Sequence, residues 1–397
     1  MKVNTFLPKY MVEFKCVSSS CTDSCCAGWD INIDEDTYNK YVNSTGELKG
    51  LLDGKFIKSE DEHDSFNYGF MVLKDENRCP FLNSNMLCDI HGGDGQENLC
   101  LTCKGYPRVF NIVDNVYEKS GLPSCMEICT RAFLNKDKME FVESKEEIEE
   151  KNIEIRRIID SEAFEGTESL LQYFWDIRVI SINIIQDRRF SIEERLNILE
   201  NFYKQIDGIY NSGEFDDMEE LLEDMNNEDI DYADLKGVTF KENNEFYISL
   251  AEDELVKKIR SVRLRACVME YKAGILNQNN ILDRITLNGS DELNQGDIGK
   301  YLKETQKYFN ELEEYAYVFE NYLVNQIFKD LIPFNKEESL IQSVKVLINS
   351  YRIIKAYVIG IAMNSQEKIG GEQIIRVIQG LSKDIEHNRV FNELLKK

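Results

Sequence analysis

All but one of the eleven cysteines in this 397-residue chain fall in one stretch near its N-terminus, and these thiols are the side chains best suited to chemistry. Most stand two to four residues from a second cysteine, a spacing at which a tight turn can aim two sulfur atoms at one centre. The cysteines of the stretch are Cys16, Cys21, Cys25, Cys26, Cys79, Cys88, Cys100, Cys103, Cys125 and Cys129. In a reducing compartment such clusters are more often metal ligands than disulfides. The spacing therefore predicts a metal domain with these cysteines as its ligand set.

The number and surroundings of the thiols favour an iron–sulfur cluster over zinc. One tetrahedral zinc takes four ligands, so these thiols exceed a single site and could serve two four-thiolate centres. Cys25 and Cys26 are adjacent and would not comfortably share one centre. Thiolate ligands suit zinc and iron–sulfur clusters alike, but apolar neighbours such as Trp29, Phe81 and Tyr106 could cover a cluster from solvent. Zinc is the alternative, and the division of cysteines among centres stays open.

The remaining candidates for metal binding are weaker. His91 follows Cys88 by three residues, and we interpret it as a hydrogen-bonding neighbour rather than a ligand. His63 and His387 have no partner at metal spacing. Cys267 lies in a helix-like run, where a small, buried core residue is expected.

The chain carries a formal net charge of −25, most of it after residue 135. Such a field repels phosphate backbones and anionic lipid, so neither nucleic acid nor a membrane is an expected partner. A cationic partner, such as a lysine-bearing protein surface, fits the charge, which also favours solubility. The N-terminus has no signal-like apolar stretch, and the longest apolar stretch near the C-terminus runs only from Ala356 to Met363. No window offers the ~18 uncharged apolar residues of a membrane span, so we expect a cytoplasmic protein.

The sequence predicts a mainly α fold in two domains. Residues 1–135 form an irregular, cysteine-rich metal-binding (iron–sulfur) N-terminal domain, and residues 136–397 form a large all-helical body. Residues 214–234 are strongly acidic and predict a solvated helix or loop. Val238 to Leu250 could form a small hairpin.

Helical spacing of apolar residues marks the elements of the body. Ser191 and Glu194 predict a capping box at the start of one helix, and Pro333 predicts the end of another. The expected apolar faces are Leu171, Trp175, Val179, Ile182 and Ile185; Phe319, Leu323, Ile327 and Leu331; and Leu340, Val344, Leu347, Tyr351, Ile354, Val358 and Ile361.

Several motifs together resemble a known family. Cys21-x3-Cys25-Cys26, Cys79-Pro80-Phe81-Leu82, Cys88-Asp89-Ile90-His91 and Cys103-Lys104-Gly105-Tyr106-Pro107 resemble a cysteine-cluster domain described as zinc- or iron-chelating. The fuller pattern resembles the bacterial flagellin lysine-N-methylases. It adds Cys25-Cys26-Ala27-Gly28-Trp29, the pair Cys125 and Cys129, the run from Glu320 to Phe328 before Pro333-Phe334, and the tail His387-Asn388-x2-Phe391.

The resemblance implies methyl transfer to lysine side chains of flagellin. The donor would be S-adenosylmethionine, and the enzyme would hold a 4Fe-4S cluster. It assigns no catalytic residues and no donor site, so only the cysteines carry over. The chain has no glycine-rich strand–turn–helix fingerprint for a nucleotide, so the donor must bind elsewhere, for instance at the cluster.

Two other classes of function remain open from the residues alone. One is a non-catalytic zinc-binding interaction module that recruits a basic partner. The other is an iron–sulfur redox protein. Bound zinc without donor binding would favour the first, and a reversible cluster potential would favour the second. The oligomeric state is not predicted.

Overall fold

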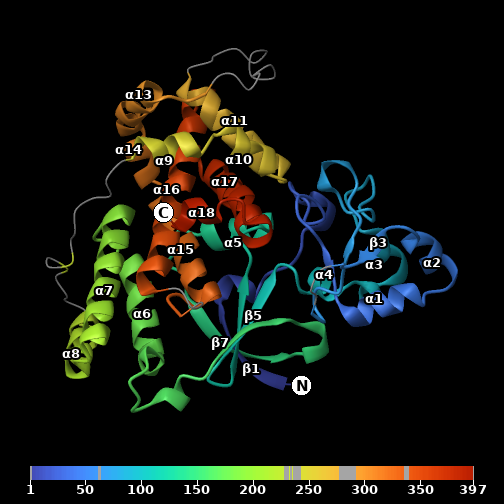
Figure 1. Cartoon of the computed structure of the whole chain (residues 1–397), viewed down its shortest axis with the longest axis horizontal. Helices are drawn as coiled ribbons and strands as arrows, with labels where there is room; N and C mark the ends of the chain where they lie inside the picture. Colours follow the sequence, from blue (N-terminus) through green and yellow to red (C-terminus); the bar gives the residue numbers. More distant parts are fainter. Residues whose placement is uncertain are drawn as a thin grey trace.

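The computed structural model describes residues 2–60, 64–227, 232, 235, 243–276, 292–334 and 339–396. Most of the secondary structure is helical, and the strands lie at the lower end of the molecule and in a side lobe (Figure 1). The strands are β1 Lys2–Pro8, β2 Asn32–Ile33, β3 Phe56–Lys58, β4 Gly69–Met71, β5 Arg108–Val113, β6 Val116–Gly121, β7 Phe141–Glu147 and β8 Ile155–Ile159. His63 lies outside the described residues.

The helices fall into a short N-terminal set and a longer C-terminal set. The first set is α1 Glu35–Val42, α2 Gly46–Leu52, α3 Asp89–Asp94, α4 Leu101–Gly105 and α5 Met126–Phe133. The second is α6 Phe174–Ile185, α7 Ile192–Ser212, α8 Phe215–Met225, α9 Asn244–Ser249, α10 Asp253–Lys258, α11 Val262–Ile275, α13 Gln295–Thr305, α14 Phe309–Glu313, α15 Ala316–Asp330, α16 Leu340–Ser365, α17 Gly371–Lys383 and α18 Asn392–Lys396. A π-helical turn, Asp384–Asn388, continues α17.

A five-stranded mixed sheet corrects the expectation of an all-helical body. Its strand order is β7-β1-β6-β5-β8, so it joins strands from both sides of residue 135. β1 pairs antiparallel with β7 and parallel with β6. The outer strand β7 is rich in Glu and Lys, which are poor strand formers by composition. Pairing with distant strands overrides that preference, and the sequence pattern does not reveal it.

A second, smaller sheet organises the cysteine-rich part. Its order is β2-β4-β3, and α1 to α4 surround it. This lobe has its own apolar core, separate from that of the helices. The core contains Ile31, Ile33, Tyr41, Leu52, Met71, Cys79, Phe81, Ile90 and Cys100.

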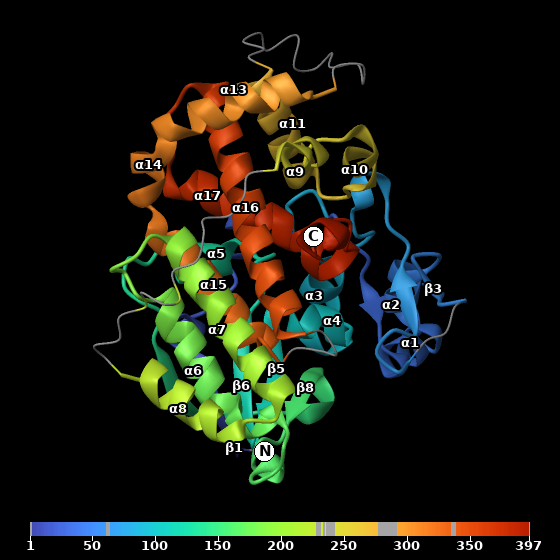
Figure 2. The same ribbon diagram turned by 60° about the vertical axis from the view of Figure 1, so that its left-hand side comes forward.

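The long helix α16 forms the centre of the helical body. It packs between α11 and α7, which Figure 2 shows on either side of it. At the crossing with α11, Gly274 lies so close that an added Cβ would stand 2.0 Å from the carbonyl oxygen of Gly360. The two glycines therefore allow a backbone-to-backbone approach.

By length and composition, α16 could cross a membrane, and 78% of its apolar window is buried inside the structure. The helix is not the run of ~18 uncharged apolar residues that the sequence was expected to lack, because Lys345, Arg352 and Lys355 lie within it. Charged residues such as Arg352 and Lys355 do not cancel the hydropathy of their neighbours. The burial is that of a core helix.

The local signals for helix ends are confirmed. Ser191 and Glu194 form a reciprocal capping box at the start of α7, and α15 ends at Asp330 before Pro333. The predicted faces of α15 and α16 are buried. The acidic stretch forms α8 where the structure describes it.

Two local predictions are wrong. In α6 the predicted face includes Trp175 and Val179, which are 39% and 45% exposed. The buried face instead follows Ile177, Ser181 and Ile184, because Arg178 between them pairs with the sheet. The proposed hairpin is contradicted in its second half, which forms α9; residues 238–242 lie outside the described part of the chain.

Candidate metal centre

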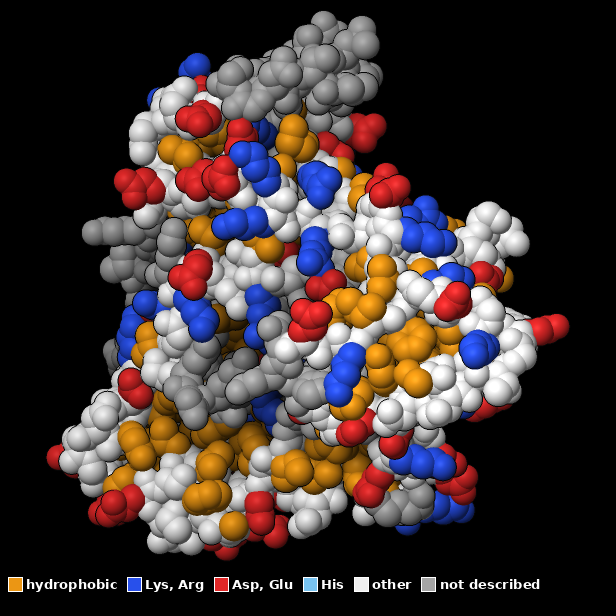
Figure 3. Space-filling model, turned by 45° about the vertical axis from the view of Figure 1, so that its right-hand side comes forward, with side chains coloured by type: hydrophobic (Ala, Val, Ile, Leu, Met, Phe, Trp, Pro, Cys, Tyr) orange, Lys and Arg blue, Asp and Glu red, His pale blue; other side chains and the backbone are white. Residues whose placement is uncertain are grey.

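Seven cysteines line one cavity of about 300 Å³ in the N-terminal part of the chain. We call it the cysteine cavity. Its thiol-bearing residues are Cys16, Cys21, Cys25, Cys26, Cys88, Cys103 and Cys125. They come from three segments far apart in sequence, which the small sheet and α5 bring together. On this face, hydrophobic side chains, a group that includes Cys, form patches among charged ones (Figure 3).

The other predicted ligands lie deeper. Cys79 and Cys100 are buried in the core of the small lobe. Cys129 is fully buried and its thiol donates to the carbonyl oxygen of Pro123 at 2.9 Å. His91 lines the cysteine cavity. Cys267 is a buried core residue of α11, as expected.

Burial keeps most of these thiols protonated. It raises the pKa of Cys79 and of Cys125 to about 12. Cys100 and Cys103 share a hydrogen bond that lowers the pKa of Cys100 and raises that of Cys103. Among the described residues, no three Cys, His, Asp or Glu side chains stand close enough to hold a single metal ion. Because thiolates are the ligating form, metal loading must release protons.

The C-terminal helix α17 holds the loop that carries Cys21, Cys25 and Cys26. Lys383 is 2% exposed, pairs with Asp23 at 2.7 Å, and donates to the carbonyl oxygen of Ser24 at 2.8 Å. Gln379 donates to the same Asp23 carboxylate at 2.8 Å. The loop therefore takes its shape from residues more than 350 positions away.

An aromatic stack continues this contact. The His387 ring lies on Trp29 with a centroid distance of 4.0 Å, and Trp29 stacks on Tyr106 at 5.7 Å. The indole N–H of Trp29 donates to the carbonyl oxygen of Cys25 at 2.8 Å. Ser124 Oγ lies 3.2 Å from the Tyr106 hydroxyl and 3.3 Å from His387 Nε2. Burial lowers the pKa of His387 to about 4, against the opposing charge of Glu386.

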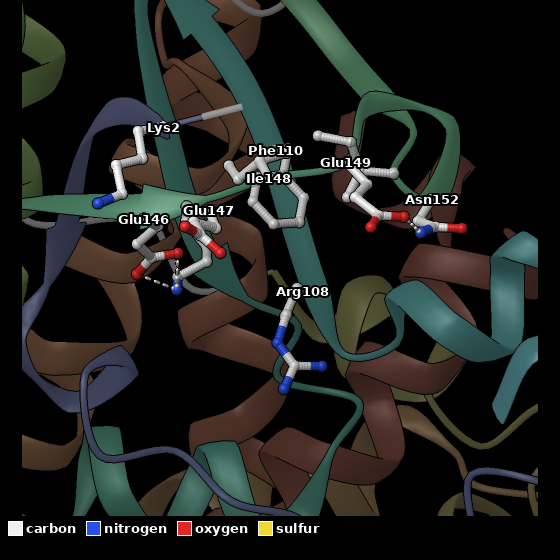
Figure 4. A pocket seen from close by; sticks show the side chains of 10 residues that line it. Lys2, Arg108, Phe110, Glu146, Glu147, Ile148, Glu149 and Asn152 are labelled. Atoms are coloured by element: carbon white, nitrogen blue, oxygen red, sulfur yellow. Dashed lines mark hydrogen bonds and ion pairs between the residues drawn. The ribbon is translucent and has the colours of Figure 1, made fainter.

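Two hollows adjoin the cysteine cavity on the side of the sheet. The first, of about 640 Å³, is lined by Trp29, Tyr106, Arg156 and His387 among others, and we call it the arginine hollow. The second, of about 670 Å³, lies over the edge of the five-stranded sheet and we call it the sheet-edge hollow (Figure 4). Arg108 lines both hollows and the cysteine cavity.

A third hollow of about 580 Å³ opens on the other side of the cysteine cavity. Cys21 and Glu127 line both of these spaces. Its wall carries Glu270, Glu367 and Glu372, together with the guanidinium groups of Arg263 and Arg376. The cysteine cavity is therefore reached from two chemically different sides.

The sequence identifies the cysteines but misses the groups that position them. Lys383, Gln379 and Arg108 belong to no motif by spacing. The one available signal is the similarity of the tail around His387 and Asn388, since Asn388 donates to the carbonyl oxygen of Gly28 at 3.0 Å.

Several known proteins share sequence with this chain. Residues 178–397 match the family model described as FliB lysine N-methylase C-terminal domain. The flagellar biosynthetic protein FliU of Salmonella muenchen is 29% identical over 142 residues, which are 35% of this chain and 82% of that protein. The lysine-N-methylases of Salmonella typhimurium and Salmonella choleraesuis are each 29% identical over 136 residues, 33% of this chain and 33% of each protein. No solved structure matches.

The fold and the cavity define a mainly helical protein with a thiol-lined site in its N-terminal third. The family match covers more than half of the chain. The chain therefore belongs to the FliB lysine N-methylase family. Its aligned part spans a third of the length of the lysine-N-methylases that it matches.

Proposed function

We propose that this protein transfers a methyl group from S-adenosylmethionine to lysine side chains of flagellin. The observation that carries the proposal is the family match over residues 178–397, whose last long helix, α17, anchors the cysteine loop. The names of the relatives, lysine-N-methylase and flagellar biosynthetic protein, support a lysine substrate and a flagellar target. We place the reaction in the cytoplasm, where thiols stay reduced.

The residues fit a 4Fe-4S cluster as the resident group. Such a cluster needs a space with thiolates spread around it, and the cysteine cavity supplies seven thiols on its wall. Four of them, with no more than one of Cys25 and Cys26, would be needed to complete a cubane, and a cluster with three cysteine ligands would keep one iron open. When bound, the cluster would supply either structural support or an iron for the donor's amino acid group. Cys79, Cys100 and Cys129 are buried and do not line this cavity. They remain candidate ligands of a second centre.

The reaction itself requires little covalent chemistry from the protein. The lysine Nζ forms a bond to the methyl carbon while the bond between that carbon and the donor's sulfur breaks. The electron pair of the broken bond stays on sulfur. A lysine amine has a pKa of ~10.4 in water, so it must lose one proton to react. Exclusion of water in a pocket would lower that pKa. His387 is neutral but a weak base, and we assign no general base.

One preparation tests both the cofactor and the activity. The protein purified without oxygen is expected to be brown, with about four irons and four sulfides per chain. Incubation with flagellin and S-adenosylmethionine is expected to add methyl units to lysine, read by mass spectrometry of flagellin peptides. A colourless protein with stoichiometric zinc would remove the cluster from the proposal. Unmodified flagellin after incubation with the brown protein would remove the substrate.

A further inference from the structure

We propose that the arginine hollow binds the methyl donor and that Arg108 holds its α-carboxylate. This inference rests on the proposed function for the identity of the donor. It assigns a position and an anchor residue that neither the motifs nor the relatives' names provide. The argument depends on charge, aromatic surface and connection to the cysteine cavity.

Arg108 offers a positive charge that no carboxylate in the described part of the chain neutralises. Its guanidinium lies over the ring of Phe14 at 5.3 Å, and no ion pair or hydrogen bond to it is found among the described residues. In Figure 4 its side chain extends away from the strand, apart from the paired groups around Glu146. Lys119, the nearby lysine of the same sheet, is instead held by Glu146 at 2.6 Å.

Several charges in or beside the arginine hollow are paired, while Glu154 and Arg389 line it at exposed positions. Lys329 lies 2.6 Å from Glu386 and 2.7 Å from Asp330, and Arg156 bridges the same two carboxylates. Although burial alone would raise it, Lys329 and Arg156 lower the pKa of Glu386 to about 2. These carboxylates are therefore occupied. The hollow presents positive charge to a ligand at Arg108 and at Arg389, and of these two Arg108 also lines the cysteine cavity; such a charge suits an anion such as a carboxylate.

The wall beside Arg108 is aromatic. Trp29 and Tyr106 line both the arginine hollow and the cysteine cavity, and His387, which also lines the hollow, stacks on Trp29. Aromatic rings accept both a stacked adenine and a sulfonium cation, because the ring face is electron-rich. A donor in this hollow would thus lie next to the cavity without occupying it.

The size of the space agrees with such a ligand. Sites for small molecules usually enclose about 300–1,000 Å³, and the arginine hollow has about 640 Å³. The sheet-edge hollow, which also meets Arg108, sets Lys2, Lys119 and Arg108 against Glu146, Glu147 and Glu149, and its described lining residues include no Trp or Tyr. Arg108 would therefore bind the donor's α-carboxylate on the side of the arginine hollow.

Calorimetric binding of two ligands to the anaerobically purified protein tests the inference. S-adenosylhomocysteine keeps the donor's carboxylate, and methylthioadenosine lacks the amino acid portion. Arg108→Gln is expected to weaken the first by about tenfold or more, the scale of a charge-assisted hydrogen bond. It should leave the affinity for methylthioadenosine unchanged. Arg189→Gln, at an exposed arginine that pairs with Asp187 and lines none of the three spaces, is the matched control.

Each outcome decides the inference. Equal losses for the two ligands, no loss for either, or no binding of S-adenosylhomocysteine by the unchanged protein would overturn it. If Arg108→Gln fails to fold, Arg108→Lys decides, because lysine keeps the charge but not the two-pronged geometry; a loss confined to S-adenosylhomocysteine supports the assignment. Binding of this ligand by a protein that leaves flagellin unmodified would refute the substrate in the proposed function and not the donor site.

Discussion

The side-chain amine of Lys383 donates to the carbonyl oxygen of Ser24 at 2.8 Å, so a helix near the C-terminal end holds the loop of the first cysteines. Lys383→Met removes this donor and takes from the Asp23 carboxylate its lysine partner, leaving Gln379 at 2.8 Å and Arg263 at 4.0 Å. We expect the free energy of unfolding to fall by about 3 kcal/mol, measured by urea denaturation. We also expect less iron per chain after anaerobic purification.

Lys257→Met is the matched control, because Lys257 pairs with Glu254 on an exposed helical face. It should change neither stability nor iron content. Full iron content in Lys383→Met would show that the loop keeps its shape without α17.

The cysteine cavity predicts which thiols hold iron. Cys25→Ser and Cys103→Ser are expected to lose iron, sulfide and visible absorbance, because both residues line the cavity. Cys267→Ala lies in the core of α11 and should keep all three signals. If loss of iron follows Cys267→Ala, or if neither cavity variant loses it, the cavity is not the metal centre.

The buried pair of Arg178 and Glu118 joins α6 to the sheet. Its two hydrogen bonds are 2.6 and 2.7 Å long, and the side chains are 2% and 1% exposed. Arg178→Met leaves a buried carboxylate uncompensated, so the free energy of unfolding should fall by about 3–5 kcal/mol. The double variant Glu118→Gln/Arg178→Met should recover much of that loss. A double variant as unstable as the sum of the two single variants would rule out this explanation.

The close approach of α11 and α16 predicts opposite effects for two glycines. A methyl group at Gly274 would meet the backbone of Gly360, so Gly274→Ala should cost about 1–3 kcal/mol. At Gly208 in α7 an added Cβ would have no neighbouring atom within 4 Å, so Gly208→Ala should stabilise by about 0.5–1 kcal/mol. Thermal denaturation of the two variants compares them directly. A tolerated Gly274→Ala would mean that the helices can separate.

His387 predicts a pH dependence of stability. Burial lowers its pKa in the folded protein to about 4 from the usual value near 6.5, so the unfolded chain binds the proton more readily. Its contribution is complete above pH ~6.5 and is lost as the pH falls toward ~4, about 2 kcal/mol between pH ~7.5 and pH ~5. In His387→Gln, the free energy of unfolding measured by urea denaturation should lose that part of its dependence on pH. An unchanged slope in the variant would assign the acid sensitivity to other groups.

Local sequence signals predicted local structure well. The capping box at Ser191 and the helix end before Pro333 depend on neighbouring residues, and both are confirmed. The five-stranded sheet was missed because β1 pairs with β7 across more than a hundred residues, as in the contact of Thr5 with Ser144. No repeating pattern of residues within either strand indicates which strand it pairs with.

The candidate site likewise has a part that the sequence indicated and a part that it did not. Cysteine spacing pointed to a region in which seven of the ten thiols line one cavity, since turns within each segment set the distances between close pairs; the metal they would hold stays a prediction. The residues around that cavity could not be inferred, because Arg108 and Lys383 act through contacts between segments. A single positive side chain in a sequence looks the same whether it is solvated or aimed at a ligand.

The anchoring of the cysteine loop by α17 also sets an order of events during biosynthesis. The ribosome makes the cysteines before the residues that fix their loop, with Lys383 following Ser24 by 359 positions. For most of translation the thiols are thus attached to a nascent chain without their final support. If the thiols hold the proposed cluster, its assembly in the finished geometry must wait until α17 has left the exit tunnel, so cofactor delivery would be a late step and the emerging thiols would need protection until then.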